Sequence, residues 1–210
     1  MPLQDYKNTY EESLSNNDAF WLEKAQQRLT WMRPPSVALQ GGFKDLDFTW
    51  FADGQLNASV QCLDRHLAAQ GEKTAIIWAK DEPGEYEHIS YNDLHARVCR
   101  MANLLQSQGV ERGDRVCLYL PMVPELAVAM LACARIGAIH SIVFAGFSAA
   151  ALRDRIVDAQ CALVITADEG LRGGKRVPLK EITDAAVEQC PCVETVLVVK
   201  RSGAKVPMEP

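Results

Sequence analysis

Hydrophobic residues in the second part of the chain gather in short runs, separated by longer segments with helical spacing. Most runs are rich in Val, Ile and Leu, and they predict strands at residues 74–78, 86–89, 115–120, 140–144, 161–166 and 195–199. The segments between them predict helices at residues 60–70, 90–109, 124–135, 149–158 and 179–188. The first two strands are expected to form a hairpin. The later alternation predicts an α/β fold, a mostly parallel sheet flanked by helices on both faces.

The first sixty residues follow a different pattern, with one predicted helix and an irregular, aromatic remainder. The helix is predicted to start at Asp18 and to run to about Trp31, before Pro34 and Pro35 stop it. Three of the four tryptophans lie before residue 60, and we expect this region to wrap over another surface. We therefore divide the chain at residues 1–60 and 61–210. No predicted helix follows the strand at residues 195–199, so the second domain is expected to be incomplete.

The loop at residues 167–180, ADEGLRGGKRVPLK, is the clearest candidate for a binding site. Its cations are Arg172, Lys175, Arg176 and Lys180, and its anions are Asp168 and Glu169. Gly173 and Gly174 allow positive φ and close approach of a ligand, while the cations suit phosphate. The loop and the segment Phe144-Ala145-Gly146 both follow predicted parallel strands, where ligands bind in such sheets. We expect a site for an anionic ligand, and the alternative is an ordinary solvated turn.

Composition and motifs exclude several classes of function. The chain has 210 residues, a formal net charge of −5 and 48% hydrophobic residues, which fits a globular protein without affinity for nucleic acid or membranes. The N-terminus has no secretory signal, and most of the seven cysteines lie in apolar stretches, as free thiols of a cytoplasmic protein do. Walker A, dinucleotide-binding, G-x-S-x-G and H-E-x-x-H motifs are absent. We assign no catalytic residue and no metal ligand.

Several longer segments together resemble the AMP-forming acetyl-CoA synthetases, which belong to the acyl-adenylate-forming superfamily. The matching segments are Phe20-Trp21, Trp31, Trp50–Asn57, Leu63–Leu67, Gly113–Val116, Pro121–Leu126, Met130–Ser141, Val143–Ser148 and Ala167–Lys180. They cover nearly the whole chain, and the stretch from Pro121 to Lys180 is the most specific. The resemblance implies that residues 1–60 are the N-terminal extension of this family. Residues 61–210 would be the first portion of its AMP-binding domain.

The resemblance also implies an activity and a CoA site. Enzymes of this family join acetate to CoA with ATP through acetyl-adenylate, and Mg²⁺ is expected with the ATP. Their basic loop binds the phosphorylated nucleotide end of CoA, which corresponds here to Arg172, Gly173, Gly174 and Lys175. The segment Phe144, Ala145 and Gly146 is expected to lie against the CoA adenine. Lys175 replaces an Arg of some members, and Ala145 replaces a frequent Gly.

The family's phosphate loop with its lysine, its acetate pocket, its ribose-binding aspartate and its C-terminal lid have no counterpart among these residues. We therefore expect an N-terminal fragment that is inactive alone. A propionate–CoA ligase is an alternative within the class, although Pro121–Leu126 and Asp168–Gly170 look more like the acetate enzymes. A stand-alone CoA- or nucleotide-binding module is the alternative from another class. Acyl specificity and oligomeric state stay open at this point.

Overall fold

The structure, a computed structural model, describes residues 2–208 and divides into two compact units, Met1–Arg65 and His66–Pro210. In the first unit, α1 (Leu3–Ser15) and α2 (Asn17–Arg28) precede a small antiparallel hairpin. Its strands are β1 (Leu39–Gly42) and β2 (Asp47–Trp50), and a 3₁₀ helix at Phe43–Asp45 joins them. A π-helical segment, Val60–Asp64, leads into α3 (Arg65–Gln70).

The helix predicted from Asp18 to Trp31 is wrong at both ends. Asn16 precedes the helix and Asp18 lies within its first turn, while Leu29 is already extended, with φ −113° and ψ 148°. The pattern also missed α1, because this helix buries none of its residues and so carries no apolar face toward a core. The predicted helix at residues 60–70 is present, although its first part, Val60–Asp64, is π-helical and runs directly into α3.

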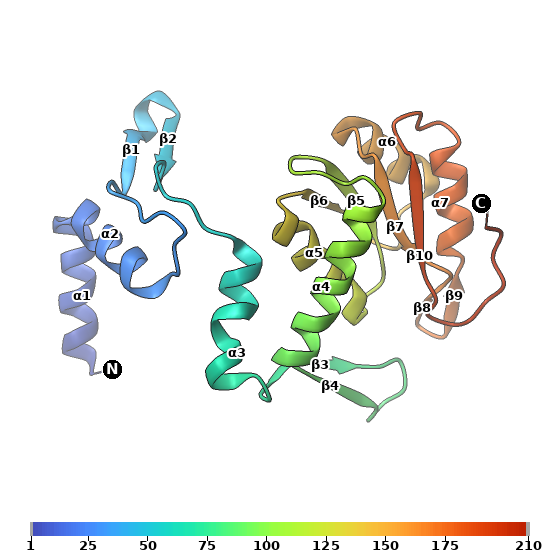
Figure 1. Cartoon of the computed structure of the whole chain (residues 1–210), viewed down its shortest axis with the longest axis horizontal. Coiled ribbons are helices and arrows are strands. Elements are labelled where there is room, and N and C mark those ends of the chain that lie inside the picture. Colours follow the sequence, from blue (N-terminus) through green and yellow to red (C-terminus); the bar gives the residue numbers. More distant parts are fainter. Residues whose placement is uncertain (1, 209–210) are drawn as a thin grey trace. The chain divides into compact units, whose positions relative to one another are not determined.

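The second unit is built on a four-stranded parallel sheet in the order β10-β7-β5-β6, as Figure 1 shows. The strands are β5 (Arg115–Tyr119), β6 (Ile139–Ile142), β7 (Leu163–Ala167) and β10 (Thr195–Val199). All five residues of the central strand β7 are buried, whereas β6 at one edge keeps Ile139 and Ile142 about half exposed. The predicted α/β fold with a parallel sheet is therefore confirmed.

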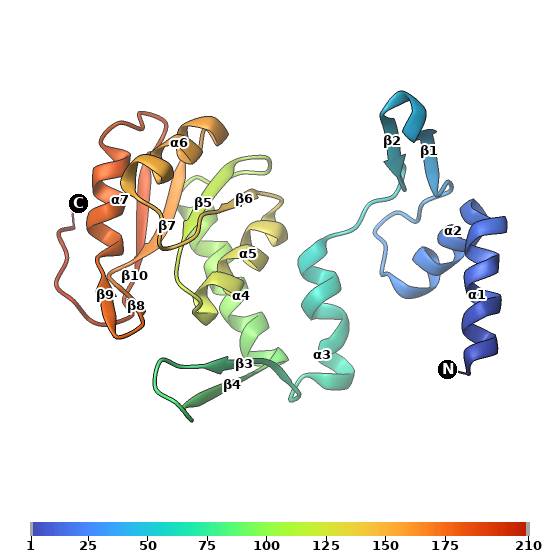
Figure 2. The same cartoon turned by 180° about the vertical axis from the view of Figure 1, so that it is seen from behind.

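Helices connect the parallel strands and cover both faces of the sheet. They are α4 (Tyr91–Ser107), α5 (Pro124–Ile136), α6 (Ala149–Ala159) and α7 (Leu179–Val187). α4 packs on α5, which contacts β5 and β6, while α6 packs on α7 and these two contact β5 and β7. Right-handed crossovers to β6 and then back to β7 require α5 and α6 to lie on opposite faces, and Figures 1 and 2 show this arrangement.

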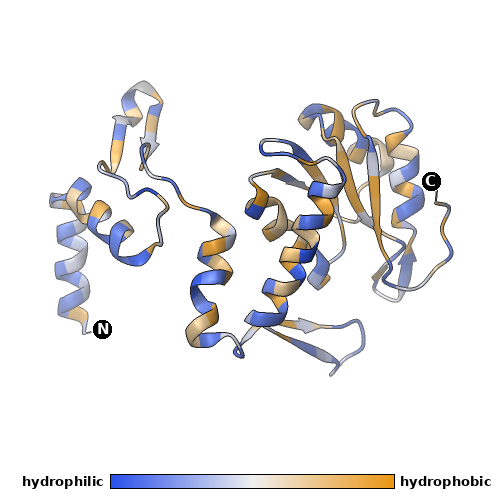
Figure 3. Ribbon diagram, in the orientation of Figure 1, coloured by the Kyte–Doolittle hydropathy of each residue, from blue (hydrophilic) through white to orange (hydrophobic). Residues whose placement is uncertain are grey.

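Local signals explain where these helices begin and end. Ser90 accepts a hydrogen bond from the backbone amide of Asp93 at the start of α4, as the capping pattern predicts. α5 has Pro124 in its first turn and ends at Gly137, whose φ is 80°. The side chain of Ser148 likewise caps α6. The strands of the sheet are largely hydrophobic along their length (Figure 3), as expected between two layers of helices.

Two antiparallel hairpins accompany the parallel sheet. β3 (Thr74–Ala79) and β4 (Tyr86–Ser90) form the first, which confirms the predicted hairpin. β8 (Gly170–Arg172) and β9 (Lys175–Val177) form the second, within the basic loop. No strand is predicted within that loop from the sequence, because strands of three residues are too short to give a periodic signal.

Candidate functional site

The basic hairpin β8–β9 presents two cations on either side of a tight glycine turn. Arg172 and Lys175 lie opposite each other in the register, with Gly173 and Gly174 between them. These glycines have φ values of 56° and 75°. Two successive positive φ values define the type I′ turn that suits a two-residue hairpin, and glycine adopts it without strain. The Gly-Gly pair therefore forces the chain to reverse where the two charged side chains are exposed.

The other two cations of the loop are already paired. Arg176 Nη1 lies 2.6 Å from Glu169 Oε2, at the base of the hairpin. Lys180 is buried on α7, and its Nζ lies 2.6 Å from Asp184 Oδ2. Lys180 is therefore not one of the loop's exposed cations, although it lies in the same basic stretch of sequence. Within residues 2–208, Arg172 and Lys175 make no ion pair, so these two cations are available to an anion.

Arg172 is seated on the segment that follows β6. Its Cζ lies 5.1 Å from the ring centroid of Phe144, a cation–π distance. Gly146 passes so close that a Cβ there would come within 2.6 Å of Phe144 Cε1 and 2.9 Å of Arg172 Nη1. β5 lies between β6 and β7, and the carboxyl ends of these parallel strands meet at one edge of the sheet. The structure thus brings Arg172, Phe144 and Gly146 together.

The turn Phe144–Phe147 is held in place by a hydrogen bond from Tyr119 and carries two aromatic rings that contact each other. The buried Tyr119 donates its hydroxyl hydrogen to the carbonyl of Phe147 at 2.7 Å, and burial raises the pKa of this phenol. Phe147 meets Phe144 edge to face, with centroids 5.8 Å apart, and the Arg155 guanidinium lies 4.7 Å over the Phe147 ring. Nothing in the sequence indicates that Arg155, on α6, belongs to this surface. Helical spacing does not show which loop residue a helical side chain will contact.

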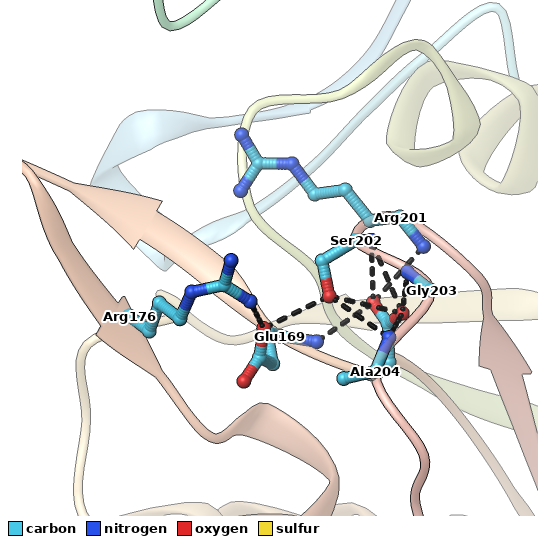
Figure 4. A network of polar contacts seen from close by, with 7 residues as sticks. Glu169, Arg176, Arg201, Ser202, Gly203 and Ala204 are labelled. Carbon is cyan, nitrogen blue, oxygen red and sulfur yellow. Dashed lines mark hydrogen bonds and ion pairs between the residues drawn. The ribbon is translucent and has the colours of Figure 1, made fainter.

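Asp168 has a different role from the one its sequence position suggests. Its carboxylate is buried and accepts hydrogen bonds from the backbone amides of Glu169 and of residues 201–204, at 2.8–3.2 Å. Burial disfavours the charged form, but these amides outweigh it and lower the pKa of Asp168 to about 2. Figure 4 shows the network, which joins Glu169 and Arg176 to the turn after β10. Asp168 is therefore an anchor of the backbone and offers no exposed charge.

Comparison with known proteins gives the family. The sequence profile described as AMP-binding enzyme matches residues 63–209, and the profile described as acetyl-coenzyme A synthetase N-terminus matches residues 6–62. The chain belongs to the AMP-binding enzyme family. The predicted resemblance to acetyl-CoA synthetases is confirmed, since both profiles and the relatives below agree with it.

Relatives of this chain include an acetyl-coenzyme A synthetase 2 of Pseudomonas aeruginosa, 54% identical over 97% of this chain and 32% of the relative. An acetyl-coenzyme A synthetase of Desulfatibacillum aliphaticivorans is 55% identical, again over 97% of this chain and 32% of the relative. The chain thus spans about a third of the length of the curated relatives it matches. Among solved structures, acetoacetyl-CoA synthetase from Streptomyces lividans superposes with a TM-score of 0.86 at 25% identity, covering 94% of this chain and 30% of its own.

The rest of the described chain offers few other candidate sites. Residues 2–208 hold no group of three or more His, Cys, Asp or Glu side chains suited to a metal ion. Among the described helices, none is long and apolar enough to cross a membrane. An open cavity of about 640 Å³ lies at the end of α3, lined by residues 67–73 and Asn92, but it includes no residue of the basic hairpin. The strongest candidate site is therefore the surface formed by the hairpin β8–β9 and the turn Phe144–Phe147.

Proposed function

We propose that the chain forms the N-terminal part of an AMP-forming acetate–CoA ligase and supplies part of its CoA site. The complete ligase would convert acetate, ATP and CoA to acetyl-CoA, AMP and pyrophosphate through an acetyl-adenylate. Residues 1–60 would form the N-terminal extension, and residues 61–210 the first portion of the AMP-binding domain. The seven free cysteines support a cytoplasmic location.

The proposed CoA site rests on two exposed cations, Arg172 and Lys175. CoA bears a 3′-phosphate and a pyrophosphate at its adenosine end, and both need fixed cations. The I′ turn at Gly173 and Gly174 exposes backbone between the two cations, and neither side chain is engaged in an ion pair within residues 2–208. In this proposal Arg172, Gly173, Gly174 and Lys175 bind phosphate.

The adenine would lie against Phe144, Ala145 and Gly146. Phe144 is 55% exposed, so part of its ring surface is open although Arg172 lies over it. A guanidinium seated on the ring would place phosphate and base binding side by side. Ala145 adds a methyl group at the turn, which narrows this approach slightly relative to glycine.

The remaining chemistry of the ligase is assigned to no residue of this chain. Adenylation would use groups for ATP and acetate outside it, and the Mg²⁺ expected with ATP has no proposed ligand here. Acetate is favoured over propionate because the relatives at 52–55% identity are named acetyl-coenzyme A synthetases. The stand-alone binding module is not favoured, because the chain matches only about a third of those relatives.

Titration of the chain with CoA and with dephospho-CoA, followed by amide NMR at low salt, tests this proposal. A charge-assisted contact to phosphate contributes about 1.5–3 kcal/mol, so Arg172→Ala should weaken CoA binding roughly ten- to a hundredfold. The mutant should also lose most of the preference for CoA over dephospho-CoA.

Lys80→Ala is the matched control, because Lys80 is a cation stacked 5.7 Å over Trp78 on the other hairpin. It should leave CoA binding unchanged. If Arg172→Ala leaves CoA binding unchanged as well, the hairpin is a structural turn and the proposed CoA site is wrong.

A further inference from the structure

Two segments far apart in sequence meet at the carboxylate of Asp168. The residue follows β7 directly, and its backbone amide donates to the carbonyl of Val199, which extends the pairing of β7 with β10. On its other side, the carboxylate is enclosed by the turn of residues 201–204, which leaves β10. The start of the basic hairpin and the end of the sheet's edge strand are therefore tied to one side chain.

The turn of residues 201–204 is shaped around an anion. Four consecutive backbone amides point at the carboxylate, with distances of 2.9 Å from Arg201, 2.8 Å from Gly203 and 3.2 Å from Ala204. Ser202 also contributes its amide, at 3.1 Å from Oδ2. Gly203 has φ 77°, the left-handed conformation that lets successive amides converge. Without the Asp168 side chain these four amides would lose their shared acceptor, so the turn depends on Asp168.

A second set of contacts leads from the turn to the hairpin. The hydroxyl of Ser202 lies 2.9 Å from Glu169 Oε2, and the same carboxylate oxygen lies 2.6 Å from Arg176 Nη1. Arg176 is on β9, opposite Leu171 of β8. The dashed lines in Figure 4 thus run from Ser202 in the turn, through Glu169, to Arg176 on β9. Lys175 is on the same strand.

The same contacts keep a carboxylate away from the proposed anion site. Glu169 is only three residues from Arg172, and a free carboxylate there would compete with phosphate for the exposed cations. Ser202 and Arg176 hold it at the base of the hairpin instead. Arg201 is itself fixed, with Nη2 at 2.5 Å from Asp81 Oδ2 in the turn between β3 and β4.

We propose that Asp168 is a positioning residue for the phosphate site: through the turn at residues 201–204 and Glu169, it holds the hairpin so that Arg172 and Lys175 can face one ligand. The proposal rests on the CoA site proposed above. Asp168 touches no ligand in it. Its effect on phosphate binding passes entirely through the backbone turn, the Ser202 hydroxyl and the pairing of Glu169 with Arg176.

The test compares Asp168→Asn, Ser202→Ala and Ser202→Thr in the full chain, with Asp154→Asn as control. Asp154 is an exposed carboxylate paired with Arg153, outside the network. Hydrogen exchange should accelerate in residues 170–177 of Asp168→Asn and, less strongly, of Ser202→Ala, while amides of β5 and α5 keep their protection. CoA binding should weaken about tenfold in Asp168→Asn and about threefold in Ser202→Ala. Ser202→Thr retains the hydroxyl, so its hydrogen exchange in residues 170–177 and its CoA affinity should match those of the unmodified chain.

The ratio of CoA to dephospho-CoA affinity separates positioning from general damage, because a merely less stable chain would lose affinity for both ligands equally. We expect the ratio to fall in Asp168→Asn and Ser202→Ala and to stay constant in Asp154→Asn. If Arg172→Ala weakens CoA binding and Ser202→Ala does not change the ratio, the positioning role is overturned while the CoA site stands. If Arg172→Ala has no effect, the proposed CoA site itself fails. Should Asp168→Asn not fold, Ser202→Ala against Ser202→Thr decides the matter.

Discussion

The two hairpins of the second unit are both antiparallel, but they differ in strand length and in the charge of the residues at their turns. β3–β4 has strands of six and five residues, and its turn carries Asp81, Glu82 and Glu85. β8–β9 has strands of three residues and a turn flanked by Arg172 and Lys175. Trp78 of the first hairpin donates a hydrogen bond to the carbonyl of Met122, so its strand is held by a side chain. The second is held mainly through the contacts around Asp168 and Glu169.

The difference shows how a short hairpin can carry a site without a core of its own. Strands of three residues bury little apolar area, so the geometry of β8–β9 must come from a tight turn and from polar contacts at its base. In these contacts Glu169 and Arg176 pair with each other, whereas Arg172 and Lys175 remain exposed and without an ion pair among the described residues. The longer hairpin also has a polar contact at its turn, between Asp81 and Arg201, but its strands are longer. Its only described cation near the turn, Lys80, stacks on Trp78.

Among changes that leave both Arg172 and Lys175 in place, the largest effect on CoA binding is expected from filling the space beside Gly146, where Arg172 lies against Phe144. In Gly146→Ala, the new Cβ would lie 2.6 Å from Phe144 Cε1 and 2.9 Å from Arg172 Nη1, so one of these side chains must move. Overpacking of this kind costs about 1–3 kcal/mol, and CoA binding should weaken roughly five- to a hundredfold. Ala145→Gly is the control, since it removes a methyl group and should leave binding unchanged or slightly tighter. Unchanged CoA binding in Gly146→Ala would show that the seat of Arg172 on Phe144 is irrelevant to the ligand.

A smaller effect should separate the two turns directly. Gly174 has φ 75° and Gly84 has φ 88°, so alanine at either position would be strained by about 1–2 kcal/mol. Gly84→Ala and Gly174→Ala should therefore lower the free energy of unfolding by similar amounts. Only Gly174→Ala should weaken CoA binding, by about fivefold, because only that turn positions the exposed cations. Thermal unfolding and CoA titration of both mutants measure the comparison, and equal loss of CoA binding would contradict it.

These contrasts also explain how far the sequence could predict the fold. The parallel sheet, its helices and the hairpin β3–β4 were predicted because apolar runs, capping residues and glycine stops act locally, as at Ser90, Pro124 and Gly137. α1 and the hairpin β8–β9 were missed because one buries no residue and the other has strands below the length at which periodicity shows. The π-helical start at Val60–Asp64 has no sequence signal that we can identify.

The residue types of the candidate site could be predicted from the sequence, but their spatial arrangement could be predicted only in part. The Gly-Gly pair and its neighbouring cations are visible in the sequence, and so is their place after a strand. Which cations are paired depends on the local fold: Lys180 pairs with Asp184 one turn further along α7, and Arg176 pairs with Glu169 across the hairpin. The enclosure of Asp168 by residues 201–204 joins positions more than thirty residues apart, and local sequence patterns carry no information about it.

Acid should loosen the second hairpin before it affects the first. The pKa of Asp168 is lowered to about 2 in the folded chain, from an ordinary value near 3.8, so its contribution to stability is complete above about pH 4. The contribution is lost as the pH falls from about 4 through 2, and protection of residues 170–177 and 201–204 against hydrogen exchange should fall with it. Asp168→Asn should remove this pH dependence. Equal acid sensitivity of β3–β4 and β8–β9 in the unmodified chain would argue against the anchor.

The smallest effect is expected where charge is kept and only its shape changes. Lys175 lies opposite Arg172 across the I′ turn and makes no ion pair within residues 2–208, so its ammonium can act on a phosphate as a point charge. In Lys175→Arg, a planar guanidinium could form two parallel hydrogen bonds to the same phosphate, which should tighten CoA binding by up to about threefold. Lys80→Arg, on the other hairpin, should not change CoA binding at all. The two mutants are compared by CoA titration at low and at moderate salt, because a gain that comes from phosphate contacts must shrink as salt screens the charges. If Lys175→Arg instead weakens CoA binding tenfold, the position requires the reach of a lysine, and the ligand phosphate lies farther from the turn than proposed.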